Sequence, residues 1–171
     1  MKLNVKEVAL FGMLGALTFA LTFAMKGLPN IEPVSMFIIA ITVVFRFKAL
    51  YPIYVYVMLE GIYMGFSLWW VPYLWMWAIL WGIVMLLPKR MPIWLSPIVY
   101  CAVSGLFGLS FGTLWAPFQM VVFNLGFDGA IKWIIAGFPW DVAHAIGNVI
   151  IAILTLPMIL ILKKAVKIIS K

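Results

Sequence analysis

Helix-length apolar runs follow one another through the whole chain, and they constrain its fold more than any other feature. They cover residues 7–25, 34–45, 49–68, 71–87, 94–125 and 139–162. An α-helix needs roughly 17–25 apolar residues to cross the hydrocarbon layer, whereas an outer-membrane barrel shows shorter, alternating segments. We therefore expect an all-α fold: an integral membrane bundle of six transmembrane helices, with residues 1–171 forming a single domain.

Three of these runs differ from a simple continuous span. Residues 34–45 are barely long enough to cross, unless the helix extends into its flanks or lies partly buried in protein. Residues 94–125 contain three glycines and Pro117, which are expected to interrupt the helix. A linker at 126–129 and a short piece at 130–136 precede the last helix, which is expected to begin at Pro139.

Composition agrees with this class. Of the 171 residues 67% are hydrophobic and 10% are charged, whereas a soluble domain is about half apolar and about a quarter charged. The basic residues that give the net charge of +7 are therefore expected to set the orientation of the chain in the membrane and to contact anionic headgroups. No nucleic-acid partner is expected. The single Cys101 excludes an internal disulfide framework.

The basic residues predict the orientation. With six spans, two of the twelve, Lys26 and Lys132, fall on one side of the membrane. The other side holds Lys2, Lys6, Arg46, Lys48, Lys89, Arg90, Lys163, Lys164, Lys167 and Lys171. Because Lys and Arg accumulate in cytoplasmic loops, both the N-terminus and the C-terminus are expected in the cytoplasm.

Polar side chains share one face at the start of the last helix. Asp141, His144 and Asn148 recur at i, i+3 and i+7, next to Trp140. Such side chains in an apolar helix need a polar partner or a ligand. A structural alternative is that Asp141 stabilises a helix N-terminus and that His144 bonds to Glu60 or to a carbonyl.

Further candidates lie at the same expected depth. Glu60 shares a helix face with Tyr56 and Tyr63, and a carboxyl in the membrane must be neutral, paired or wetted. It could line a cavity or make a structural bond to another helix. Aromatic residues repeat every three or four positions at Trp70, Tyr73, Trp77 and Trp81, which suits the wall of a ligand pocket, although interfacial aromatic belts are also ordinary. Trp115 and Gln119 add to this set.

Small residues recur every fourth position in the first helix, at Gly12, Ala16, Ala20 and Ala24. This spacing allows another helix to approach closely. The partner could be a helix of the same chain or a separate membrane subunit.

No pattern of catalytic or metal-binding residues is present in the sequence. One histidine and scattered carboxylates do not form a zinc site, and there is no HExxH motif, phosphate-binding loop or Ser/Lys dyad. We therefore expect no catalytic residues, no metal and no catalytic cofactor.

With these features the chain resembles the S components of energy-coupling factor (ECF) transporters, small six-helix bacterial membrane proteins. The resemblance is carried by the size, the topology, the small residues of the first helix, the motif Leu28-Pro29-Asn30-Ile31-Glu32-Pro33, and the stretch from Gly137 to Asn148. It implies a non-enzymatic subunit of the bacterial plasma membrane that binds a vitamin from outside. It also implies docking through the first helix onto a shared transmembrane coupling subunit, with two ATPase subunits hydrolysing ATP.

The expected ligand is a vitamin or related micronutrient. Nine tryptophans and several carboxylates favour a large ligand with apolar rings and amides, so cobalamin is the first choice. Folate, pantothenate and a queuosine precursor are the other candidates. Folate and pantothenate are somewhat less favoured, because few lysine or arginine side chains are available to bind an anionic ligand. The alternatives are an intramembrane enzyme using Asp141 and His144 as an acid/base pair, or a structural accessory subunit.

Overall fold

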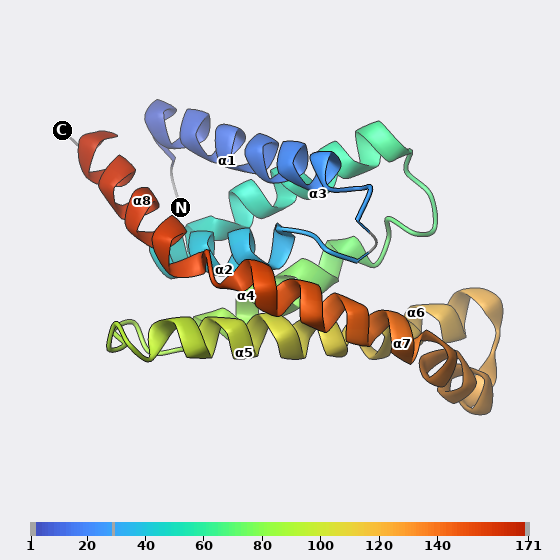
Figure 1. The fold of residues 1–171 in the computed structure, drawn as a ribbon. Helices are drawn as coiled ribbons and strands as arrows, with labels where there is room; N and C mark the ends of the chain where they lie inside the picture. The colour runs from blue at the N-terminus through green and yellow to red at the C-terminus, as the bar shows by residue number, and fades with distance from the viewer. Residues whose placement is uncertain (1–2, 29, 170–171) are drawn as a thin grey trace.

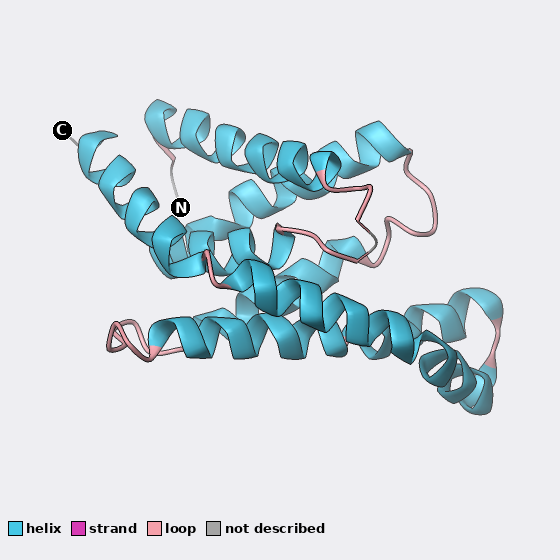
Figure 2. Ribbon diagram, viewed as in Figure 1, coloured by secondary structure: helices cyan, strands magenta, loops and turns pink. Residues whose placement is uncertain are grey.

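The computed structural model describes residues 3–28 and 30–169, and every regular element within them is a helix (Figure 2). Lys2, Pro29 and Lys171, which entered the predictions above, lie outside the described residues. In chain order the elements are α1 (Val5–Ala24), α2 (Val34–Phe45), the short 3-10 helix η1 (Arg46–Ala49), α3 (Leu50–Met64), α4 (Tyr73–Leu86), α5 (Ser96–Leu109), α6 (Phe111–Phe123), α7 (Gly126–Ala152) and α8 (Thr155–Ile169).

Four helical stretches are long and apolar enough to cross a membrane. They are Val5–Ala24, Val34–Met64, Ser96–Phe123 and Gly126–Ala152, and α4 is a shorter apolar helix. A chain with this many apolar helices needs a lipid environment, because water cannot solvate their outer faces. The structure therefore confirms the all-α class and supports a helical membrane protein.

The helix α2 lies at the centre of the bundle. Its first nine residues, 34–42, are all buried, and it packs against α4, α5, α7 and α8 (Figure 1). A helix that is apolar all round is stable only when neighbours cover every face. Its short length is thus explained by burial in protein, and its predicted bounds, 34–45, agree with the structure.

Two of the predicted helix boundaries are wrong. The helix that was predicted to begin at Pro139 is α7, which begins at Gly126 and contains Pro139 in its interior. The expected linker at 126–129 and the piece at 130–136 are therefore helical. Glycine and aspartate at 126–129 are typical of turns, but the turn is confined to Asn124 and Gly126, both with positive φ, where α6 ends and α7 starts. Proline is tolerated within membrane helices because neighbouring groups satisfy the freed backbone.

The far end of the last predicted helix also differs. The run 139–162 is interrupted at Ile153 and Leu154, and α8 starts at Thr155. Pro157 cannot donate a backbone hydrogen bond to the carbonyl of Ile153, which explains the break. The run 94–125 is interrupted as expected, and the break between α5 and α6 is at Ser110.

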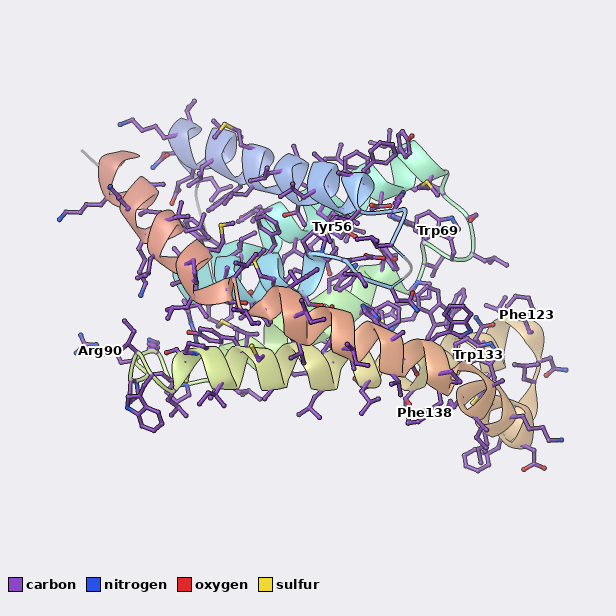
Figure 3. The ribbon with its side chains drawn as sticks, viewed as in Figure 1. Tyr56, Trp69, Arg90, Phe123, Trp133 and Phe138 are labelled. Carbon is purple, nitrogen blue, oxygen red and sulfur yellow. The ribbon has the colours of Figure 1, made fainter. Side chains whose placement is uncertain are left out.

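Both termini and the turn between α2 and α3 lie toward the same end of the bundle (Figure 1). At this end the side chains of Lys48 and Glu7 form an ion pair that links η1 to α1. The Nη2 of Arg46 donates to the carbonyl of Met85 at 2.7 Å, which ties η1 to the end of α4. Arg90 lies at the same end (Figure 3), so basic residues gather there.

Candidate functional site

Two adjoining cavities lie at the end of the bundle opposite the termini, where Figure 3 shows Trp69 and Trp133 far from Arg90. They share two wall residues, Glu32 and Tyr73. The larger, here called the aromatic chamber, has a volume of about 310 Å³. The smaller, here called the Glu60 chamber, has a volume of about 240 Å³.

The aromatic chamber is built from consecutive turns of three helices. The α4 helix contributes Tyr73 and Trp77, α6 contributes Phe111 and Trp115, and α7 contributes residues one turn apart. The remaining wall residues are Asn30, Glu32, Gly112, Trp133, Gly137, Trp140, Asp141 and His144. The chamber is therefore a largely aromatic box with two carboxyl groups in its wall.

Edge contacts between rings hold these walls in place. The ring centroids of Tyr73 and Trp77 are 5.4 Å apart, and those of Phe111 and His144 are 4.8 Å apart. Trp115 lies 6.0 Å from Tyr73 and 5.6 Å from Phe111. Such pairs contribute roughly 0.5–1.5 kcal/mol each beyond their buried area, so the box is preformed and not assembled by a ligand.

The Glu60 chamber is more polar. Its wall residues are Thr22, Lys26, Glu32, Tyr56, Glu60, Met64, Trp69 and Tyr73. The Nζ of Lys26 lies 3.6 Å from Oε2 of Glu60, whose side chain is 5% exposed. Glu60 thus pairs with a lysine at the end of α1, and the expected alternative, a bond from His144 to Glu60, is not among the described interactions.

Three buried polar atoms in the chamber walls have no hydrogen-bond partner among the described residues: Tyr56 Oη, Glu60 Oε1 and Trp77 Nε1. These residues are 1%, 4% and 1% exposed, respectively. An unsatisfied buried polar group costs about 1–3 kcal/mol, and native proteins contain few of them. Three of the seven such atoms among the described residues therefore belong to residues of these walls, and the other four lie elsewhere in the bundle.

Asp141 also has a structural role. Its Oδ1 accepts a hydrogen bond from the backbone N–H of Gly112 at 3.0 Å, at the first turn of α6. This N–H belongs to a helix start and needs an acceptor, which a carboxylate supplies well. Asp141 therefore stabilises the N-terminus of α6, not that of its own helix, where it lies in the interior.

Glu32 lies at the junction of the chambers, just before α2. Burial raises the pKa of its carboxyl, repulsion from Glu60 raises it further, and Lys26 opposes the shift. Next to it, the Nδ2 of Asn30 donates to the carbonyl of Trp140 at 3.2 Å. This bond fastens the loop between α1 and α2 over α7, and so holds Glu32 in the wall.

The structure brings most of the predicted site residues together. Those that line a chamber are Glu60, Tyr73, Trp77, Trp115, Trp140, Asp141 and His144. Trp140 is 63% exposed and lies at the rim. Four predicted residues line neither chamber: Tyr63, Trp70, Gln119 and Asn148.

Three of these four have other partners. The Nδ2 of Asn148 donates to Ser35 Oγ at 3.1 Å and to the carbonyl of Ser104 at 3.0 Å, joining α7 to α2 and α5. The Nε1 of Trp70 donates to the carbonyl of Val57 at 2.8 Å. Tyr63 is 55% exposed and packs at the surface against Phe23 on α1.

Several wall residues were not among the predicted site residues. Tyr56 belongs to the same helix face as Glu60, and Glu32 belongs to the loop motif before α2, so both carried a usable signal. Trp133 was assigned to the short piece at 130–136, where nothing distinguished it. Its place in the wall depends on α7 starting at Gly126.

Besides a hollow of about 340 Å³ along the first half of α1, two still larger hollows lie elsewhere. One, of about 730 Å³, runs along the outer side of α3, and the other, of about 550 Å³, lies between α5 and α7. Their walls are almost entirely apolar, with residues such as Met58 and Leu106. In a membrane these surfaces contact acyl chains, so neither has the polar groups that would select a ligand.

The small residues of α1 face away from the rest of the chain. Ala16, Ala20 and Ala24 are exposed, and a side-chain atom added to Gly12 would meet nothing within 4 Å. Gly15, on the opposite face, is where α3 approaches, with Val55 Cγ1 only 2.5 Å from the position of an added Cβ. No helix among the described residues covers the outer face.

Within the part of the chain that the structure describes, no three His, Cys, Asp or Glu side chains are grouped to hold a metal ion. The chain matches no protein-family model, no curated protein and no solved structure.

Proposed function

We propose that the chain is the substrate-binding membrane subunit, or S component, of an ECF-type transporter that takes up a vitamin or related micronutrient. The observation that carries this proposal is the pair of preformed cavities with three unpartnered buried polar atoms in their walls. A cavity of this kind binds a small molecule that supplies the missing hydrogen bonds.

The proposed topology has six spans with both termini in the cytoplasm. The residues 34–64 then cross twice, reversing at Arg46, and α4 crosses as a short span. The support is the distribution of charge: basic residues gather at the end that carries the termini, and the cavities lie at the other end. By the positive-inside rule the basic end is cytoplasmic, so the chambers open outside the cell.

The volumes bear on the choice of vitamin. Ligand pockets span about 300–1,000 Å³. The aromatic chamber, at about 310 Å³, lies at the bottom of that range, and the Glu60 chamber, at about 240 Å³, lies below it. We therefore favour a vitamin of two or three rings, occupying both chambers past Tyr73, over cobalamin. Folate, pantothenate and a queuosine precursor remain candidates on size.

Docking onto the coupling subunit is proposed at the outer face of α1. The face formed by Gly12, Ala16, Ala20 and Ala24 is uncovered and small, which permits close helix contact in lipid. The two ATPase subunits of the transporter hydrolyse ATP and drive delivery of the vitamin to the cytoplasm.

Vitamin uptake by a bacterium that cannot make the vitamin tests this function. The chain is expressed in the auxotrophic host together with an ECF coupling subunit and its ATPases, and growth at limiting vitamin is measured. We expect growth that depends on both the chain and an active ATPase. Failure to support growth on any vitamin, or turnover of a lipid or peptide by the purified chain, would contradict the proposal.

A further inference from the structure

The chambers concentrate acidic side chains in a basic protein. Three of the five acidic residues, Glu32, Glu60 and Asp141, line their walls. Of the basic residues that the structure describes, only Lys26 does so. The described chamber walls therefore hold more acidic than basic side chains, although the whole chain has a formal net charge of +7.

Only one of these three carboxyl groups, that of Glu60, has a basic partner among the described residues. The salt bridges among the described residues pair Lys26 with Glu60 and Lys48 with Glu7, so Glu32 and Asp141 have no basic partner there. The Lys26 contact reaches only Oε2 of Glu60 and leaves the buried Oε1 without a hydrogen bond. Buried carboxylates of this kind are costly unless a countercharge joins them.

The aromatic chamber supplies the other half of a cation site. Tyr73, Trp77 and Trp115 present ring faces and edges from two helices, and Trp133 and Trp140 close the wall from α7. An aromatic face attracts a cation within about 6 Å of its centroid, and most strongly when the ring is tryptophan. An anion in this chamber would meet Glu32 and Asp141 with no lysine or arginine among the described wall residues.

We propose that the site selects a planar organic cation. Its positively charged ring lies in the aromatic chamber beside Glu32 and Asp141, and a hydrogen-bonding arm passes Tyr73 into the Glu60 chamber. There Tyr56 Oη and Glu60 Oε1 bond to the arm. This inference rests on the proposed function and narrows it, since it names the charge and shape of the transported molecule.

The arrangement assigns a separate task to each chamber. Rings and carboxylates in the aromatic chamber select a flat, positively charged group. In the Glu60 chamber the hydroxyl of Tyr56 and the Oε1 atom of Glu60 select a polar group at a fixed distance from it. Two-point recognition of this kind rejects analogues that leave a buried polar group unpaired.

A charge-graded panel of vitamins tests the inference. The full-length chain is purified in detergent, and binding is followed by quenching of its tryptophan fluorescence. Thiamin is the permanent cation, riboflavin and cobalamin are the ligands without a small cationic ring, and biotin and pantothenate are the anions. We expect thiamin to bind most tightly and the anions most weakly.

A matched pair of variants then tests the placement. Glu32→Gln removes a carboxylate from the junction of the chambers, and Asp128→Asn removes an exposed one from the start of α7, outside both. Glu32→Gln is expected to weaken thiamin binding by about tenfold or more, which corresponds to the loss of one charge-assisted contact. Asp128→Asn should leave it within about twofold.

Each outcome decides a different point. If riboflavin, cobalamin or an anion binds most tightly, the cation inference is wrong and the vitamin-binding function stands. If no member of the panel binds, the cation inference is wrong, and the growth assay described above decides whether the vitamin-binding function stands. If thiamin binds but Glu32→Gln and Glu60→Gln both leave its affinity unchanged, the assignment of the cation to these chambers is wrong.

Discussion

Tyr56 brings a phenolic hydroxyl into the interior of the bundle and leaves it without a partner. The residue is 1% exposed and lines the Glu60 chamber. Under the proposed function, this hydroxyl bonds to the ligand when the chamber is filled. The same reasoning applies to Trp77 Nε1 in the aromatic chamber.

Replacing Tyr56 by Phe should separate binding from stability. We expect Tyr56→Phe to weaken ligand binding by about tenfold, because a hydrogen bond to the ligand is lost, and to change the free energy of unfolding by less than about 1 kcal/mol. Binding is measured by tryptophan fluorescence and stability by thermal unfolding in detergent.

Thr42 provides the matched control. Its Oγ1 is also buried and unpartnered, but it belongs to α2 and lines neither chamber. Thr42→Val should leave binding unchanged. Equal effects of the two substitutions on binding would show that an unpartnered hydroxyl in this bundle has nothing to do with a ligand.

The raised pKa of Glu32 predicts how binding of a cation depends on pH. Because burial and Glu60 raise this pKa, the empty site holds a proton to a higher pH than an exposed glutamate does. A cation needs the carboxylate, so affinity should be full above the raised pKa and fall as the pH drops through it. The other titratable groups around the chambers are Lys26, Tyr56, Glu60, Tyr73, Asp141 and His144.

Isothermal titration of a cationic ligand at several pH values measures this dependence. Binding should release protons, and Glu32→Gln should flatten the profile. A profile that Glu32→Gln leaves unchanged would assign the titration to another of these groups.

Single residues could be predicted from the sequence only as far as their helix face. Asp141, His144 and Asn148 do share a face of α7, as their spacing predicts. Periodicity does not say which neighbour covers each turn: Asp141 and His144 meet the aromatic chamber, while Asn148 meets Ser35 and Ser104. That depends on the packing of α2 and α5, which involves residues far away in the sequence.

At the scale of the helices, α1 has two faces with different tasks. Gly15 allows α3 to pack closely, since an added Cβ there would lie 2.8 Å from the carbonyl oxygen of Pro52. Ala16 and Ala20 are exposed and so face away from the rest of the bundle. One helix therefore joins the bundle and presents a free surface.

Substitutions on the two faces of α1 should fail in different ways. Ala20→Trp is expected to preserve folding and ligand binding but to abolish uptake in the presence of the coupling subunit and ATPases. Gly15→Leu is expected to destabilise the chain by several kcal/mol through overpacking against α3, so that both binding and uptake are lost. Uptake of labelled vitamin and size-exclusion chromatography distinguish the two. Normal uptake by both Ala16→Trp and Ala20→Trp would show that this face does not dock.

The helices themselves were predictable to different degrees. The bounds of α2 follow from a continuous apolar run between Pro33 and Arg46. The start of α7 does not, because Gly126 and Gly129 suggest a loop, and tertiary packing overrides that local preference. The walls formed by Trp133 and Gly137 were missed for that reason.

At the scale of the whole molecule, charge is divided between two ends. The end with the termini carries Arg46, Lys48 and Arg90, and the other end carries the acidic chambers. This division predicts the orientation in the membrane and, with it, the side from which a ligand enters.

Cysteine labelling in intact cells tests that orientation. In a Cys101→Ser background, Asp128→Cys should react with a membrane-impermeant maleimide from outside. Lys89→Cys, in the turn before α5, should react only after the cells are permeabilised. Labelling of Lys89→Cys from outside would place the basic end outside and reverse the proposed direction of binding.

The central claim is that the two chambers hold a small molecule. The most direct measurement is mass spectrometry of small molecules released from the chain after purification in detergent from bacteria grown in rich medium, with Glu60→Gln purified in parallel. We predict one vitamin-sized compound at close to one equivalent from the wild-type chain and much less from Glu60→Gln. Recovery of no enriched compound from a folded wild-type chain, or equal amounts from both proteins, would contradict the claim.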